Sequence, residues 1–201
     1  MGDVVADMSM SLDGFSTGPN DSPENPLGEG GDRLHEWMSG LGDWGERHDL
    51  TGPHAEVFRA SRGHVGAAVM GRRVFGNGVE PWGDDPPFHV PVFVVTHRAR
   101  EPLVKQGGTT YTFVTDGIAS ALAQAQAAAG DKDVLLGGGA DIVRQFIHAG
   151  LLDELQLHLV PVLLGGGIRL FDQMGPEPVE LGSMRVIDAT GVTHLRFRVM
   201  K

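Results

Sequence analysis

The feature that most constrains the fold is an alternation of short apolar runs with helical patterns through most of the chain. The runs are rich in Val, Ala, Leu or Phe and are bounded by Gly, Pro or Asp, which is typical of buried strands. They cover residues 4–10, 65–70, 90–96, 111–115 and 134–137. Because helical patterns lie between several of these runs, the sequence favours an α/β fold with a largely parallel sheet and helices on both faces.

Apolar spacing and end signals predict four helices. Apolar residues at i, i+3, i+4 and i+7 form one stripe over 32–41, and a second helix is expected after Pro53. Asp116 can cap a third helix that ends at Gly130, and the same apolar pattern recurs before Gly150. The last two helices lie between strands, which favours parallel pairing there.

The C-terminal third has a different pattern. Runs 155–164, 179–189 and 192–200 are predicted strands with no helical pattern long enough to connect them, so this end is expected to be antiparallel. Segment 16–31 is poor in apolar residues and dense in turn formers, which indicates a long surface loop of the kind that often closes active sites. No repeat or linker divides the sequence, and we expect one domain over 1–201.

Composition limits the chemistry. The sequence contains no cysteine, so disulfides and thiolate metal sites are excluded and redox chemistry requires a cofactor. A formal net charge of −10 opposes association with nucleic acid and with anionic membranes, so neither is expected as a partner. The N-terminus lacks the pattern of a secretion signal and no apolar run approaches the length of a membrane span, so a cytoplasmic location is expected.

A glycine triplet separates the last run of the alternating region from the helical pattern that follows it. Glycine lets the backbone approach a ligand closely, and the first amides of the next helix point out of its N-terminus. Such a turn can bind a pyrophosphate, while a tight strand-to-helix turn with no ligand is the alternative that the triplet alone leaves open. The positions are Gly137, Gly138, Gly139, Ala140, Asp141 and Ile142.

Two other predicted strand ends carry side chains that suit an anion. Arg72 and Arg73 follow the second apolar run, and the third run ends in Thr96, which His97 and Arg98 follow. Arginine offers a planar, permanently charged fork that matches phosphate oxygens, although a surface arginine pair is most often solvated charge. Since ligands of open α/β sheets gather at the carboxyl ends of strands, three such ends together predict a phosphate-rich cofactor.

Five short motifs occur in a characteristic order. They are Ser-Leu-Asp-Gly-Phe at 11–15, Met-Gly-Arg-Arg at 70–73, Val-Thr-His-Arg at 95–98, Leu-Gly-Gly-Gly at 136–139 and Gly-Leu-Leu-Asp-Glu-Leu at 150–155. Their order and spacing resemble the dihydrofolate reductase-like superfamily, most closely the branch that contains the reductase domain of the bifunctional riboflavin-biosynthesis deaminase-reductase. The resemblance implies a central mixed, mostly parallel sheet of about eight strands, flanked by helices, with NADPH across it.

The resemblance also implies a place for each candidate cofactor residue. The arginine pair would contact the cofactor phosphates, with the backbone of Val74 nearby. Val74 stands where the family often has threonine, so a hydroxyl contact is lost. Segment 96–98 would surround the adenosine and its 2′-phosphate, which favours NADPH over NADH. Segment 137–142 would take the pyrophosphate and pass under the nicotinamide.

Two residues are predicted to act on the substrate. Asp13 lies just after the first strand, where the family places the substrate and nicotinamide pocket; alternatively, Asp-Gly is an ordinary turn pair. His158 alternates with leucines in the run 155–164, on the strand face that meets the substrate in such folds, with a core or interface histidine as the alternative. Trp37 and Met38 are expected to wall the substrate pocket or else to be plain core.

Together these features predict an NADPH-dependent reductase that transfers a hydride to a small heterocyclic or carbonyl-type metabolite. One alternative is a riboflavin-pathway ribosylaminopyrimidine reductase, although Phe15 stands where those enzymes usually carry lysine. Dihydrofolate is not favoured, since neither Asp32 nor Glu36 has the surroundings expected of the acid that protonates a pterin. A non-catalytic NADPH-binding regulatory protein is the other alternative. Relatives of this branch tend to dimerise through their late strands, so a homodimer is expected.

Overall fold

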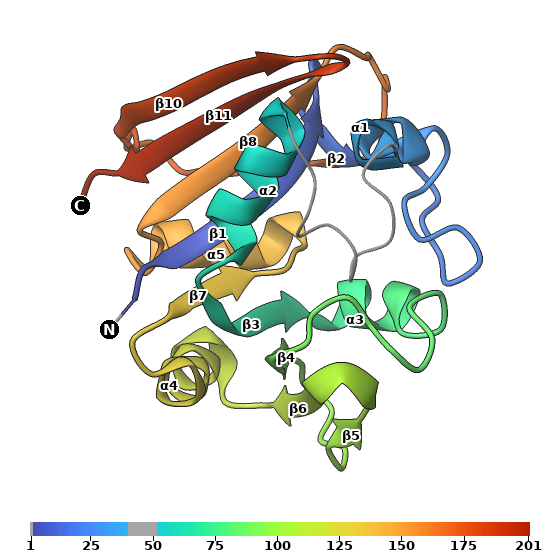
Figure 1. Ribbon diagram of the computed structural model, residues 1–201, viewed down its shortest axis with the longest axis vertical. Helices are drawn as coiled ribbons and strands as arrows, with labels where there is room; N and C mark the ends of the chain where they lie inside the picture. The colour runs from blue at the N-terminus through green and yellow to red at the C-terminus, as the bar shows by residue number, and fades with distance from the viewer. Residues whose placement is uncertain (1, 40–51) are drawn as a thin grey trace.

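The computed structural model describes residues 2–39 and 52–201, and most of its strands join one large sheet (Figure 1). The strands of this sheet are β1 Val4–Ser11, β3 Val65–Gly71, β4 Pro91–Val95, β5 Leu103–Val104, β6 Thr110–Val114, β7 Asp133–Leu136, β8 Glu154–Val160, β10 Leu181–Ala189 and β11 Val192–Val199. Within the described residues the sheet has nine strands, in the order β10-β11-β8-β1-β7-β3-β4-β6-β5. A second sheet pairs β2 (Phe15–Thr17) with β9 (Ile168–Arg169).

The pairing of the strands is mixed and mostly parallel. β1 is parallel to both β7 and β8, and β3 is parallel to both β4 and β7. β11 is antiparallel to β8. It is also antiparallel to β10, because a two-residue turn at 190–191 connects these two strands directly. The predicted α/β fold with a mixed, mostly parallel sheet is therefore confirmed, as is the antiparallel C-terminal end.

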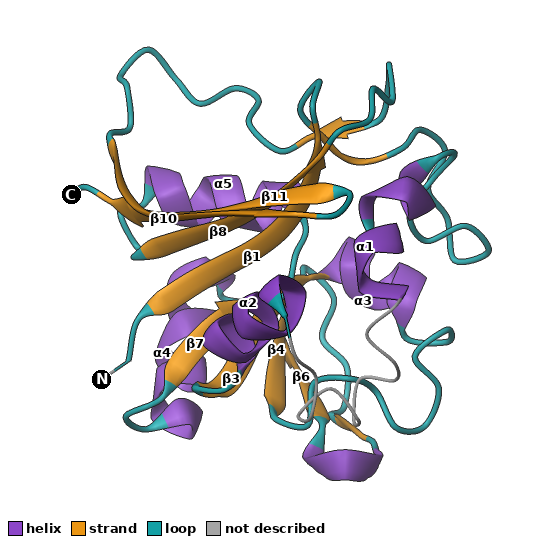
Figure 2. Cartoon of the chain, turned by 45° about the horizontal axis from the view of Figure 1, so that its top comes forward, coloured by secondary structure: helices purple, strands orange, loops and turns teal. Residues whose placement is uncertain are grey.

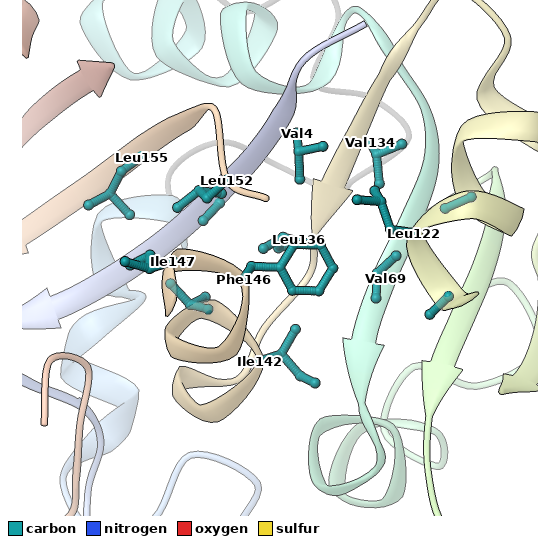
Figure 3. Packing of buried hydrophobic residues seen from close by; sticks show 14 of the residues in the cluster. Val4, Val69, Leu122, Val134, Leu136, Ile142, Phe146, Ile147, Leu152 and Leu155 are labelled. Carbon is teal, nitrogen blue, oxygen red and sulfur yellow. The ribbon is translucent and has the colours of Figure 1, made fainter. Parts of the chain in front are cut away.

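Helices cover both faces of the sheet (Figure 2). Side chains alternate along β3: Val69 packs with residues of α4 and α5, whereas Ala68 and Met70 pack with Phe75 of α3 on the opposite face. The largest cluster surrounds Phe146, whose ring is fully buried (Figure 3). The helices are α1 Glu36–Ser39, α2 Pro53–Arg62, α3 Arg72–Gly78, α4 Gly117–Ala129 and α5 Ala140–His148, with 3-10 turns η1 at Gly31–Leu34 and η3 at Gln106–Gly108.

The single helix predicted over 32–41 is wrong. Residues 31–39 form η1 and then α1, with His35 between them, and positions 40 and 41 lie outside the described residues. The indole Nε1 of Trp37 donates a hydrogen bond of 3.1 Å to the Leu34 carbonyl, which a continuous helix would use for its own backbone. Leu34 is fully buried in a separate cluster with Val160 and Val192, so tertiary packing and this side-chain bond override the helical stripe.

Two smaller expectations also change. The run 155–164 is a strand only to Val160, because Pro161 cannot donate to a sheet ladder. Segment 16–31 contains β2 and buried positions such as Ser16, so it is partly structured and not simply a surface loop. Asp116 occupies the N-cap of α4 as predicted, but its side chain makes no capping hydrogen bond.

No helix among residues 2–39 and 52–201 is both long and apolar enough to cross a lipid bilayer.

Candidate functional site

A cavity of about 810 Å³ lies where the carboxyl ends of several strands of the main sheet meet. Its wall includes Gly71 at the end of β3, Val95 at the end of β4 and Gly137 after β7. This is the position at which open α/β sheets bind ligands. The size is within the range of small-molecule and cofactor sites, about 300–1,000 Å³.

The glycine triplet and the start of α5 form one wall. All six residues from Gly137 to Ile142 line the cavity. The first helical hydrogen bond of α5 runs from the Val143 amide to the Gly139 carbonyl at 3.2 Å, so the amides of Ala140, Asp141 and Ile142 are left for a ligand. Gly138 has φ +101°, a backbone conformation that favours glycine. A Cβ added at Gly139 would lie 3.2 Å from Val74 Cγ2, so the turn is packed closely against α3.

The two strand ends with basic residues contribute unequally. Arg72, Arg73, Thr96 and His97 line the cavity together with Val74, whereas Arg98 is not among its lining residues. The backbone amide of Arg98 donates to Thr96 Oγ1 at 3.1 Å. The structure therefore brings together all of the predicted cofactor residues except Arg98.

Asp21, in the segment predicted to be a lid, holds one of the two arginines. Arg73 Nε donates to Asp21 Oδ2 at 2.6 Å, and a second, shorter bond joins Arg73 Nη2 to Asp21 Oδ1. Asn77 Nδ2 also donates to this carboxylate, at 2.9 Å. Asp21, Pro26 and Leu27 all line the cavity, so segment 16–31 forms part of its wall. Arg72 has no such partner among residues 2–39 and 52–201 and is the guanidinium available to an anion.

The end of the cavity nearest β8 contains His158, and Trp37 and Met38 also line the cavity; that these residues contact a substrate stays a prediction. His158 is buried, with its Nε2 2.7 Å from Asp7 Oδ1. The ring centroids of Trp37 and His158 are 4.6 Å apart. Phe58 also lines this end, which therefore combines flat apolar surface with a buried imidazole–carboxylate pair.

Three residues connected to this end were not predicted from the sequence: Asp7, which lines the cavity, and His194 and His54, which continue from His158 away from it. His158 Nδ1 is 2.7 Å from His194 Nδ1, and His194 Nε2 is 3.1 Å from His54 Nδ1. One signal was available, because Asp7 shares one face of β1 with Ser9 and Ser11, in alternation with the apolar residues Ala6, Met8 and Met10. The two histidines carry no local signal of their own.

Asp13 lies elsewhere. Its carboxylate accepts hydrogen bonds from the backbone amides of Leu164 at 3.1 Å and Gly165 at 2.7 Å, and from Ser11 Oγ at 2.5 Å. The hydrogen bond from Ser11, with those from the two amides, lowers the pKa of Asp13 to about 2. Asp13 does not line the cavity and instead anchors the loop after β8 at Leu164 and Gly165. Its placement corresponds to the turn alternative and gives no support to a catalytic role.

The burial of His194 predicts a loss of stability in mild acid. Burial, aided by positive charge on His158 and His54, lowers the pKa of His194 from 6.5 to about 4. The unfolded chain then binds a proton below pH 6.5 that the folded chain rejects, so stability falls as the pH falls from 6.5 toward 4. From about pH 7 to about pH 5, His194 alone should cost about 2 kcal/mol of unfolding free energy in urea titrations.

Two glutamine variants separate this contribution from other acid effects. His194→Gln should flatten the stability change between these pH values by about 2 kcal/mol. The exposed His64, just after α2, provides the matched control, and His64→Gln should retain the wild-type pH profile. An unchanged profile in His194→Gln would contradict the assigned shift.

Comparison with known proteins gives one family and a consistent set of folds. A model of the RibD C-terminal domain matches residues 3–193. The uncharacterised protein YyaP of Bacillus subtilis strain 168 is 25% identical over 178 residues, which cover 84% of this chain and 79% of YyaP.

Solved structures agree over the whole chain. A putative riboflavin biosynthesis protein from Shewanella sp. PV-4 superposes with a TM-score of 0.70 at 22% identity and covers 100% of both chains. Dihydrofolate reductase from Enterococcus faecalis, solved in complex with NADP(H), gives a TM-score of 0.58 at 12% identity, covering 100% of this chain and 98% of that enzyme. At these identities the likeness establishes the fold.

Proposed function

Because this chain belongs to the RibD C-terminal domain family, we propose that it is an NADPH-dependent reductase that transfers a hydride to a small heterocyclic or carbonyl-type metabolite. The resemblance predicted from the five motifs is confirmed for the family and for the dihydrofolate reductase-like fold. A reductase-type activity is the class that this family supports. The cofactor and the substrate class are inferred from the cavity.

The observation that carries the proposal is the arrangement of the two ends of one cavity. An anion-binding wall, made by the glycine turn and Arg72, faces the same space as the His158–Asp7 pair and Trp37. A dinucleotide that bridges these ends would place its phosphates at the first and its nicotinamide toward the second. A site that binds only phosphate would not need the aromatic side chain and the imidazole–carboxylate pair at the second end.

The residues present fit NADPH. The pyrophosphate would be held by the free amides of α5 and by Arg72, and Thr96 with His97 would lie along the adenosine side. Arg73 would join them when a phosphate displaces Asp21 from its guanidinium. When bound, NADPH supplies the hydride from its nicotinamide. The protein's own residues then have to orient the substrate and provide a proton.

The substrate end favours a flat, polar-edged molecule. Trp37 and Phe58 offer aromatic surface against which a planar ring can stack, while the buried imidazole of His158 offers a hydrogen bond. Phe15, which stands where riboflavin-pathway enzymes usually carry lysine, does not line the cavity, and its ring centroid lies 4.5 Å from the guanidinium carbon of Arg169.

A homodimer through the late strands is part of the proposal. β10 is an edge strand of the main sheet and bears three exposed apolar side chains. An apolar groove of about 380 Å³ adjoins it, lined by Phe171, Met174 and Leu181 among others. Uncovered edges and apolar patches of this kind are commonly buried between subunits. A second copy of the chain is the occupant that we propose.

The function is tested by NADPH binding and turnover. Fluorescence titration should show NADPH binding at least about tenfold tighter than NADH, because only NADPH carries a 2′-phosphate that basic residues of the cavity wall can bind. NADPH oxidation is then measured with dihydrofolate, a ribosylaminopyrimidine, quinones and small carbonyl compounds. Turnover of a quinone or carbonyl compound would support the proposal, whereas selective turnover of the ribosylaminopyrimidine would support the riboflavin-pathway alternative. Tight binding with no turnover of any compound would favour the non-catalytic alternative, and no NADPH binding would overturn the proposal.

A further inference from the structure

Four polar side chains from four elements form a continuous hydrogen-bonded chain beside the cavity. His158 Nε2 on β8 is 2.7 Å from Asp7 Oδ1 on β1, and His158 Nδ1 is 2.7 Å from His194 Nδ1 on β11. His194 Nε2 is in turn 3.1 Å from His54 Nδ1 on α2. We call His158, His194 and His54 the imidazole chain.

The fold fixes the three rings relative to one another. His158 and His194 are direct partners in the antiparallel pairing of β8 with β11. Trp37 packs against all three rings, with centroid separations of 4.6 Å to His158, 4.9 Å to His194 and 5.6 Å to His54. The hydrogen bonds are therefore held by the sheet and by one indole, and no mobile side chain is needed to align them.

Such a chain can move a proton without moving an atom heavier than hydrogen. A neutral imidazole has one N–H donor and one bare acceptor nitrogen. When each ring donates toward Asp7, the outer nitrogen of His54 is bare and can take a proton from water. Each bridging proton then shifts by one hydrogen bond, and the surplus proton arrives at the His158–Asp7 pair.

The two ends of the chain lie in different surroundings. Asp7 and His158 line the substrate end of the cavity, whereas His194 is 1% exposed and does not. His54 is only partly buried, in the first turn of α2, so it gives the chain a solvent end. The imidazole chain thus connects the outer surface at α2 with the cavity through the fully buried His194.

We propose that the imidazole chain and Asp7 form a proton relay that supplies the substrate end of the cavity from solvent at α2. The inference rests on the proposed function, since hydride addition to a carbonyl or imine carbon leaves the heteroatom one proton short. The heteroatom–hydrogen bond forms as the His158–Asp7 pair gives up its proton. The two bridging protons then move inward and His54 takes one proton from water at its outer nitrogen, so that one solvent proton replaces the one delivered. Each ring is then left with its proton on the nitrogen farther from Asp7, and the three rings must turn over before the next delivery.

Charged and titratable groups surround the relay along its length. Positive charge on His158, after burial itself, lowers the pKa of both His194 and His54, so a second proton on the chain is disfavoured. A hydrogen bond with the Thr190 backbone raises the pKa of His54 and partly offsets this effect at the solvent end. The other charged or titratable groups that face the inner pair are Arg62, whose Nε is 3.8 Å from Asp7 Oδ2, and His35 with Asp32 behind it.

The same distances argue against a metal site. Two imidazole nitrogens on a tetrahedral zinc ion, each about 2.0–2.1 Å from the metal, lie more than about 3.2 Å apart. The 2.7 Å between His158 Nδ1 and His194 Nδ1 is a direct hydrogen bond. No group of three or more side chains suited to hold a metal ion occurs in the described parts of the chain.

The first test needs no substrate. In ¹⁵N-histidine-labelled protein, NMR titration should show the ring nitrogens of His54 and His194 changing together with pH, because they are coupled through the same hydrogen-bonded chain. His194→Gln keeps a side chain able to hydrogen-bond both neighbours but unable to pass a proton. In this variant His54 should titrate as an isolated surface histidine. Independent titration in the wild type, unaffected by the substitution, would overturn the relay.

The second test uses whichever compound the wild type reduces. His194→Gln should lower kcat by about tenfold or more with KM little changed, and should increase the slowing caused by D₂O, because proton delivery becomes limiting. His54→Gln should act in the same direction and, at the protein surface, carries little risk of misfolding. His64→Gln, a histidine outside the relay, serves as the control and should keep wild-type turnover.

The outcomes separate the two proposals. Wild-type turnover that His194→Gln and His54→Gln leave unchanged overturns the relay and leaves the proposed function standing. Absence of wild-type turnover with every compound counts against the proposed function, while the NMR titration still decides whether the imidazoles share a proton.

Discussion

Replacing Arg72 with alanine should weaken NADPH binding by about 10- to 100-fold, the effect of losing one or more charge-assisted hydrogen bonds to a phosphate. Arg72 is the first residue of α3, is exposed on the cavity wall and has no partner within the described residues. It therefore requires no rearrangement before it binds an anion. Fluorescence titration with NADPH measures the loss, and circular dichroism checks that the variant is folded.

Arg98→Ala is the matched control for this prediction. Arg98 is also an exposed arginine that follows a strand of the same sheet, but it does not line the cavity. Its removal should change NADPH affinity by about twofold or less, as expected for a solvated surface charge. If Arg98→Ala weakened NADPH as strongly as Arg72→Ala and left NADH unaffected, the 2′-phosphate would lie at Arg98, where the motifs alone place it.

Local signals were enough to bring together most residues of the proposed cofactor end. The glycine turn, the start of α5 and residues 72–74 are each contiguous in sequence, and the parallel order of β7, β3 and β4 places their carboxyl ends side by side. The positions of the strand ends are therefore sufficient to predict that these segments lie close together. Arg98 differs because it lies two positions beyond Thr96, and periodicity does not specify how the chain turns after β4.

The substrate end could not be predicted in the same way. His194 faces His158 only because β11 returns antiparallel to β8 in one particular register, and His54 reaches them from α2 across the sheet. A shift of one residue would put His194 on the other face. Asp13 shows the opposite error, since a motif position suggested catalysis while its carboxylate binds two backbone amides of a neighbouring loop.

If the proposed homodimer forms through β10, substituting lysine for Val186 should convert it into a monomer. Val186 lies on the edge strand β10 and is 60% exposed, beside Met184 at 51% and Leu181 at 41%. In a two-fold interface each substitution occurs twice, so two ammonium groups would have to leave water. Since the effective penalty is several kcal/mol for each buried ion, the dimer should weaken by at least about 100-fold, measured by sedimentation velocity.

The opposite edge of the sheet provides the control. Val104 on β5 is 72% exposed, so it is also an exposed valine on an edge strand of the same sheet. Val104→Lys introduces the same lysine side chain with the same charge, but at a position away from the proposed interface. If both lysine variants remain dimeric, β10 is not the contact. If both become monomeric, added charge rather than the β10 surface is responsible, and only a loss confined to Val186→Lys assigns the interface to the late strands.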